Sequence, residues 1–273
     1  VKSLRSSGAP SPAGHPPTLV FNCSFCHEDK HLAQLQLYSG RLQPELAPGL
    51  PELPSPMYLA HVDCNGCHYQ DEAGPDADFS GRTMRPSRDS CAKCHGQKFQ
   101  GILDEMRGEL ASALAKTGEK LAAARAALAE KPERPAEAAR AARAAVARAE
   151  RLHAFLRAAH GEHNIYLAAV LLRALDRDLD EAGSQLQADL PDVSAEPLLS
   201  GAYCATQCHG RVGVKVPPET VRYAGKTMPH LAHTEMAGCV DCHEIGGHKS
   251  VPLRRDFKAQ CLKCHDGGAA PKL

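Results

Sequence analysis

The chain has 273 residues, and its 32 basic and 32 acidic side chains leave the polypeptide without net charge. A protein that binds nucleic acid through a basic surface is therefore not expected. Twelve cysteines and 15 histidines are too many for an ordinary cytosolic enzyme, while aromatic residues make up only 4% of the chain and tryptophan is absent.

The first 20 residues form an arm rich in Pro, Ser and Gly, which cannot bury a core by itself. A first region with three cysteine pairs covers residues 21–100, and a second with three more covers 191–273. Strand signals are scarce in both regions, so we expect short helices joined by extensive loops. A Leu-Ala-His triplet precedes one cysteine pair in each region, ending at His61 and at His233, and this indicates a duplication.

Residues 101–190 lie between these regions and differ from them, because the strong helix formers Ala, Leu, Glu, Arg and Lys dominate the segment. Pro132 and Pro135 interrupt the helical pattern. Gly161 marks a second break, before a helix expected from residue 163 to about residue 182. We predict an inserted α-helical hairpin of two or three long helices, whose alanine-rich faces allow close packing.

Two surface properties of this insert follow from its pattern. Four arginines recur along one helix and predict a solvated face: Arg140, Arg143, Arg148 and Arg151. The longest apolar stretch of the chain is the eight residues from Ile165 to Leu172. A membrane-spanning helix needs about 20 such residues, so no integral membrane span is expected.

Every cysteine belongs to a close pair that is followed at once by a histidine. Five pairs have the spacing C-x-x-C-H, and the fourth contains one additional residue. In chain order, motifs 1 to 6 are Cys23, Cys26 and His27; Cys64, Cys67 and His68; Cys91, Cys94 and His95; Cys204, Cys208 and His209; Cys239, Cys242 and His243; and Cys261, Cys264 and His265.

The spacing C-x-x-C-H is the attachment signature of c-type haem. The two thiols add to the vinyl groups of the porphyrin, and the adjacent imidazole binds the iron on its proximal side. Twelve cysteines could also form six disulfides or zinc sites built from two pairs, but neither alternative requires a histidine after each pair. We therefore predict six haem c groups, one for each motif.

Nine histidines lie outside the motifs, which is enough to supply a second axial ligand to every iron. Those close before or after a motif are the strongest candidates, together with one histidine that opens an apolar helix in the insert. The predicted distal ligands are His31, His61, His163, His230, His233 and His248. We expect His15, His153 and His160 to be solvated or on a helix surface.

With these motifs the chain resembles the hexahaem members of the multihaem c-type cytochromes, from Cys23 to His265 apart from the insert. The run from His163 to Leu172 also resembles the H-N-x-x-Y-A-x-x-L-L helix of multihaem nitrite reductases and their relatives, in which the histidine ligates a haem, although Tyr166 stands one position earlier than the tyrosine of that motif. These resemblances imply a mainly α fold with extensive loops, a core of stacked haems and mostly bis-histidine irons.

The resemblance also implies haem attachment outside the cytoplasm, and therefore an exported protein of the periplasm, the cell surface or the extracellular space. A chain that begins at Val1 rather than Met agrees with removal of an export signal. The iron chemistry implied is electron transfer along the haems, to or from redox partner proteins or extracellular electron acceptors.

Three functions stay open. The first is an electron conduit that is not an enzyme, and we expect this one. The second is a subunit of a polymeric extracellular filament, because head-to-tail contacts between copies generate open helical polymers. The third is an oxidoreductase acting on a nitrogen or sulfur oxyanion, which needs an open iron with polar neighbours. The absence of a C-x-x-C-K motif counts against a site like that of nitrite reductases.

Overall fold

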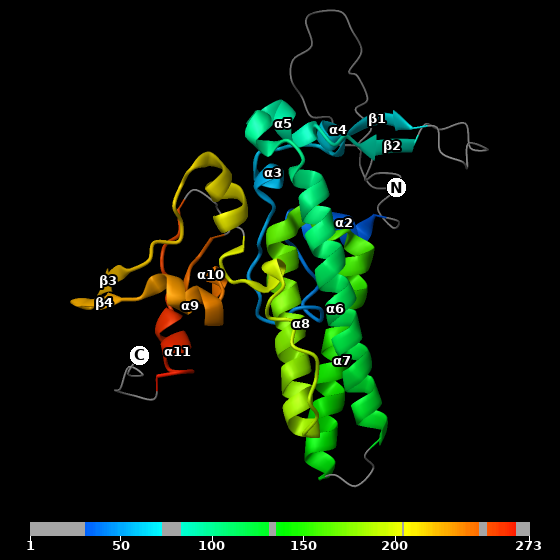
Figure 1. The fold of residues 1–273 in the computed structure, drawn as a ribbon, viewed down its shortest axis with the longest axis vertical. Helices are drawn as coiled ribbons and strands as arrows, with labels where there is room; N and C mark the ends of the chain where they lie inside the picture. Colours follow the sequence, from blue (N-terminus) through cyan, green and yellow to red (C-terminus); the bar gives the residue numbers. More distant parts are fainter. Residues whose placement is uncertain (1–30, 73–82, 131–134, 204, 246–249, 266–273) are drawn as a thin grey trace, which may run out of the picture.

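The computed structural model describes residues 31–72, 83–130, 135–203, 205–245 and 250–265. Three long helices form a bundle, with shorter helices and two small sheets gathered at one end of the bundle and along its side (Figure 1). The prediction of a mainly α fold is confirmed. In the described ranges, no helix combines the length and apolar character that crossing a membrane requires.

The bundle consists of α6 (Ile102–Glu130), α7 (Ala136–Ala159) and α8 (Ile165–Leu186), with the 3₁₀ turn η2 (Gly161–Asn164) before α8. Helix α8 begins two residues later than predicted and ends where Gln187 adopts a left-handed conformation.

The core of the bundle consists mainly of alanines from α7 and leucines from α8. Fully buried alanines of α7 are Ala142, Ala145, Ala149 and Ala159, and fully buried leucines of α8 include Leu171, Leu172, Leu175 and Leu179. Alanine lets helix backbones approach closely, while each buried leucine contributes about 1.5–3 kcal/mol relative to an exposed one. The close packing expected of the alanine-rich faces is thus observed.

The N-terminal region packs onto this bundle through α2 (Leu32–Ser39), which contacts α7. Gly40 ends α2 with φ +71°, and a Cβ atom at this position would lie 2.1 Å from the carbonyl carbon of Leu53. Only glycine suits both the left-handed backbone and this close approach. Leu37 and Leu53 are buried as part of the main core.

The remaining elements of the first region lie at one end of the bundle (Figure 1). They are α3 (Pro56–Leu59), α4 (Cys64–Cys67), β1 (His68–Glu72), β2 (Thr83–Pro86), α5 (Ser90–His95) and η1 (Gln97–Phe99). Strands β1 and β2 are antiparallel, with a register shift between His68 and Gln70. A small cluster of Ile102, Leu103 and Met106 packs against Cys91 and Phe99, and this joins α5 to the start of α6.

The C-terminal region lies beside the bundle and consists of short elements. These are η3 (Pro197–Leu199), the π-helical turn η4 (Ala205–His209), η5 (Gly210–Val212), β3 (Val221–Tyr223), β4 (Lys226–Met228), α9 (His230–Met236), α10 (Cys239–Cys242) and α11 (Phe257–Cys261). Strands β3 and β4 form a second two-stranded antiparallel sheet. An isolated bridge pairs His243 with Leu253 and ties the end of α10 to the segment before α11.

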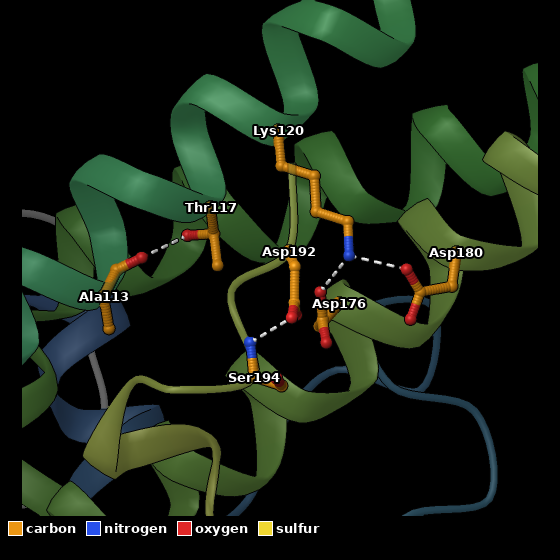
Figure 2. Close-up of polar contacts among 7 residues, drawn as sticks. All are labelled: Ala113, Thr117, Lys120, Asp176, Asp180, Asp192 and Ser194. Carbon is orange, nitrogen blue, oxygen red and sulfur yellow. Dashed lines mark hydrogen bonds and ion pairs between the residues drawn. The ribbon is translucent and has the colours of Figure 1, made fainter. Parts of the chain in front are cut away.

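Polar contacts join α6 to α8 as well (Figure 2). The side chain of Lys120 is only 3% exposed, and its Nζ donates hydrogen bonds to Asp176 at 2.6 Å and Asp180 at 2.5 Å. Burial opposes the charged ammonium, but the two carboxylates outweigh this effect and raise the pKa of Lys120. Nearby, Thr117 donates a hydrogen bond to the carbonyl of Ala113 within α6.

The predicted arginine face of α7 is only partly solvated. Arg140, Arg143 and Arg151 are exposed as expected. Arg148 instead forms ion pairs with Asp178 and Glu181 of α8, because α8 packs along that side of α7.

Candidate functional site

Four of the described motifs begin or end on short α-helices, as predicted. Motif 2 forms α4, motif 3 ends α5, motif 5 forms α10, and motif 6 begins at the last residue of α11. Residues three apart on a helical turn lie on the same side, so the two thiols of a C-x-x-C pair project from one face. All of motif 1, together with Cys204, His15 and His248, lies outside the described residues.

Motif 4 has the additional residue between its cysteines, and the structure has a matching irregularity. Residues Ala205–His209 form a π-helical turn, whose i→i+5 hydrogen bonds enclose one more residue than an α-helical turn. The wider turn accommodates the extra residue of C-x-x-x-C-H ahead of Cys208 and His209. The departure from the common spacing therefore has a local structural counterpart.

Burial raises the pKa of Cys67, Cys91, Cys208, Cys239 and Cys242. Cys67, Cys94 and Cys264, for example, form no disulfide. Within the described ranges, no group of three or more His, Cys, Asp or Glu side chains is arranged to hold a metal ion. A haem iron takes four of its ligands from the porphyrin, so it needs only two side chains.

Three motif histidines each face a histidine from outside the motifs. The ring centroids of His68 and His163 are 6.1 Å apart, those of His243 and His230 are 6.0 Å apart, and those of His265 and His233 are 6.2 Å apart. Two imidazoles on opposite sides of one metal ion have centroids about 6.2 Å apart, from metal–nitrogen bonds of about 2.0 Å and about 1.1 Å between nitrogen and ring centre. The interplanar angles of the pairs range from 6° to 83°. This spread is compatible with a shared metal ion, because each ring can turn about its metal–nitrogen bond.

Aromatic rings in ordinary contact also lie about 4.5–7 Å apart, so the hydrogen bonds of the ring nitrogens are needed as a second criterion. Nδ1 of His163 lies 3.0 Å from the carbonyl oxygen of Ala159, and Nδ1 of His233 lies 2.7 Å from that of Pro229. Nδ1 of His243 lies 2.8 Å from the carbonyl oxygen of Val251.

A carbonyl only accepts hydrogen bonds, so Nδ1 carries the proton in each of these rings and the lone pair is on Nε2. Metal-binding histidines are commonly oriented in this way by a backbone carbonyl. His230 follows the same pattern, with Nδ1 3.3 Å from the carbonyl oxygen of Pro218. Burial lowers the pKa of His163, which keeps this imidazole in the neutral form that binds metals.

The other predicted ligands are not brought to a motif histidine in the described part of the chain. His61 is exposed and has φ +57°, and His31 is exposed at the N-cap of α2. Their role as distal ligands stays a prediction. His160 is exposed beside His163, as expected, whereas His153 is half-buried and uses Nε2 to contact the carbonyl oxygen of Leu114 at 3.0 Å, because α7 packs against α6 there.

Several motifs lie near one another. Helix α4 contacts α5, which brings motif 2 close to motif 3, and the Cys67 and Cys208 thiols add to the effect of burial in raising the pKa of Cys91. Cys261 likewise contributes to the raised pKa of Cys242, and this connects motifs 5 and 6. Contacts between η1 and η5 also bring motif 4 close to motif 3.

Large apolar side chains that remain exposed are confined to the two motif-bearing regions. Among the described residues they include Met57, Leu59, Val212, Val214, Leu231, Met236, Val251 and Leu262, and none of them belongs to the insert at 101–190. The insert thus buries its large apolar side chains in a core that Leu37, Leu53 and Leu198 also join, whereas the polypeptide of the motif-bearing regions leaves apolar surface uncovered. A large apolar cofactor would cover such surface, so these regions fit the haems that the motifs predict.

Asn164 positions His163, although the sequence analysis assigned it no role of its own. It is 1% exposed, its Oδ1 accepts a hydrogen bond from the backbone N–H of Leu167, and its Nδ2 donates to the carbonyls of Leu37 and Leu53. It therefore caps α8 and holds the N-terminal region against it. An asparagine directly before an apolar helical run is a known capping signal, and this signal could have revealed the cap but not the two distant carbonyls.

Arg173 of α8 is a second residue that the sequence did not single out. A Cβ atom at Gly201 would lie 2.1 Å from Nη1 of Arg173 and 2.2 Å from the carbonyl oxygen of Thr234. The backbone at Gly201 is therefore packed between α8 and α9, the helix that carries His230 and His233. Cys239 Sγ also donates to the carbonyl of Gly201 at 3.4 Å, so the same contact positions the start of motif 5.

No known family, curated protein or solved structure matches this chain.

Proposed function

We propose that this chain is a multihaem c-type cytochrome that passes electrons among six covalently attached haems outside the cytoplasm. The three histidine pairs carry most weight, because each joins a motif histidine to a second imidazole at the separation that a shared iron requires. The orientation of Nδ1 toward backbone carbonyls supports the same reading. The haems would be bonded through the paired cysteines of motifs 1 to 6, with the histidine of each motif as proximal ligand.

In this proposal His163 is the distal ligand of the motif 2 haem, His230 that of the motif 5 haem, and His233 that of the motif 6 haem. A bound haem supplies one-electron chemistry at its iron, while the protein sets the axial ligands, the burial and the local charge. Two imidazole side chains would ligate each of these three irons, which would favour electron transfer over binding of a substrate. The neighbouring thiols of motifs 2, 3 and 4, and of motifs 5 and 6, support short steps between irons.

The finer features of the fold follow from the same proposal. Stacked haems would complete the core of the motif-bearing regions and cover their exposed apolar side chains. The three long helices would form an inserted hairpin that supplies His163 from the start of α8. Haem attachment implies export to the periplasm or the cell exterior, where redox partner proteins or extracellular acceptors exchange electrons with the chain.

The proposal is tested with native protein purified from a host that attaches c-type haem. Thioether bonds survive denaturation, so the intact mass of the unfolded protein should equal that of the chain plus six haems. Reductive titration should consume six electrons per chain, and the Cys239→Ala/Cys242→Ala variant should consume five. A colourless protein, or one whose haem is lost on denaturation, would refute the proposal.

A further inference from the structure

The guanidinium of Arg173 on α8 lies beside the start of motif 5. A Cβ atom at Gly238, the residue directly before Cys239, would lie 3.6 Å from Nη1 of Arg173. Burial raises the pKa of the Cys239 thiol, and the nearby guanidinium partly opposes this effect. A haem held by Cys239 would therefore have a positive charge next to one of its two attachment points.

This positive charge has no close partner in the part of the chain that the structure describes. Nη1 of Arg173 is buried and forms no hydrogen bond with any described residue. Asp241 of motif 5 accepts a hydrogen bond from the backbone N–H of Gly238 at 2.7 Å instead. Burial lowers the pKa of Arg173 and Asp241 opposes this effect, but a guanidinium keeps its proton in proteins. Arg173 is therefore a partly buried cation.

Water has little access to this cation. A cavity of about 20 Å³ beside Arg173 is also lined by Tyr203, Gly201 and Gly238, and such a volume holds about one water molecule. On the side of Gly201 the backbone packs closely, since a Cβ atom there would lie 2.1 Å from Nη1. A charge with so few water molecules around it is screened less than the charge of an exposed arginine.

Other charged groups around Arg173 are engaged elsewhere or lie at the surface. Asp176 and Arg177 of the same helix both affect the pKa of Arg173. The carboxylate of Asp176 accepts a hydrogen bond from Lys120 at 2.6 Å, and Arg177 is exposed to solvent. Loss of the Arg173 charge therefore changes the net charge beside motif 5 by one unit, with these neighbours unchanged.

Reduction of a haem iron adds one electron and lowers the charge of the haem by one, so a fixed cation nearby favours the ferrous state. We propose that Arg173 raises the midpoint potential of the motif 5 haem and so sets the place of this haem in the order of electron transfer. This inference rests on the proposed function, because it concerns one of the six haems. Two unit charges about 10 Å apart, at an effective dielectric constant of about 20, change an equilibrium constant roughly tenfold.

The test is a spectroelectrochemical titration of the full-length protein with its six haems. Arg173→Gln removes the charge and keeps a polar head group, and it should lower one midpoint potential by about 59 mV, the equivalent of a tenfold change for one electron. Arg173→Lys keeps the charge and should restore most of the wild-type value. Arg177→Gln, the matched control, removes a positive charge from an exposed position one turn further along α8 and should leave all six potentials in place.

A second neutral variant, Arg173→Met, keeps the test independent of how one substitution folds, and the intact mass shows which variants carry six haems. A purely structural role of Arg173 would lower the stability of the glutamine and lysine variants without separating their potentials.

The affected haem is identified in the Cys239→Ala/Cys242→Ala background, which lacks the motif 5 haem. Arg173→Gln should produce no such shift there, and a shift that persists would overturn the inference. Six unchanged potentials in the haem-loaded glutamine or methionine variant would overturn it as well. The proposed function fails on a different observation, namely a protein without covalent haem.

Discussion

Replacement of Asn164 by alanine should destabilise the protein by about 2–4 kcal/mol. Loss of the N-cap of α8 costs about 1 kcal/mol. The carbonyls of Leu37 and Leu53 lose the donors at 3.0 and 2.8 Å. The Leu37 carbonyl keeps the backbone N–H of Gly40 at 3.2 Å, so the main loss is at the Leu53 carbonyl, and a buried acceptor left without a partner costs about 1–3 kcal/mol. The lower part of the range for the whole substitution is expected, because a water molecule can enter the space that the shorter side chain leaves and bind the freed carbonyl.

The assay is guanidinium unfolding of the haem-loaded protein, followed by far-ultraviolet circular dichroism. Asn164→Ser should recover about 1 kcal/mol relative to Asn164→Ala, because serine caps helices well but is too short to reach both carbonyls. Gln185→Ala is the matched control, since Gln185 is an exposed amide in the same helix and should change stability by less than about 0.5 kcal/mol. If Asn164→Ala and Gln185→Ala were equally stable, the role assigned to Asn164 would be wrong.

Three further predictions concern the ligands, the packing of α9 and the buried lysine. His233→Met should raise one midpoint potential and leave the others in place, because methionine ligation favours ferrous haem; spectroelectrochemistry that finds no shifted potential would exclude His233 as a ligand. Gly201→Ala should lower the melting temperature, since its Cβ would lie 2.1 Å from a neighbouring guanidinium nitrogen. Gly108→Ala, in an open position of α6, should raise stability by about 0.5–1 kcal/mol, and equal melting temperatures for the two variants would count against the packing argument. Lys120→Met should destabilise by about 2 kcal/mol at neutral pH, because Asp176 loses its partner. Burial raises the pKa of Asp176, so its protonated form is favoured in the folded state and the deficit of the variant in unfolding experiments should shrink as the pH falls; a deficit that grows instead would contradict this reasoning.

The local features of this protein could be predicted from short stretches of sequence. A motif such as Cys91, Cys94 and His95 lies within one helical turn, so its geometry needs no distant partner. The long helices were equally predictable, because Ala, Leu, Glu, Arg and Lys favour a helix whatever surrounds them, and prolines interrupt it. The extra residue of motif 4 was visible as an irregularity, although its π-helical form was not.

Pairs of histidines could not be assigned in this way. His61 and His233 follow the same Leu-Ala dipeptide, yet the structure leaves His61 exposed and brings His233 to His265. The difference arises because His233 lies on α9, where its Nδ1 meets the carbonyl of Pro229, whereas His61 ends a turn with a left-handed backbone.

The sequence by itself therefore determined where long helices form and predicted which residues would attach a cofactor, since both depend on neighbours within a turn or two. Only the tertiary structure decided that His163, at the start of α8, lies opposite His68, and that His95 lies opposite no histidine of the described chain. Such choices depend on how the bundle packs against the motif-bearing regions, and Asn164 takes part in that packing through carbonyls far away in the chain. Contacts between distant segments leave no periodic pattern in the sequence. For this reason the sequence predicts the motifs and the long helices but not which histidines are brought together.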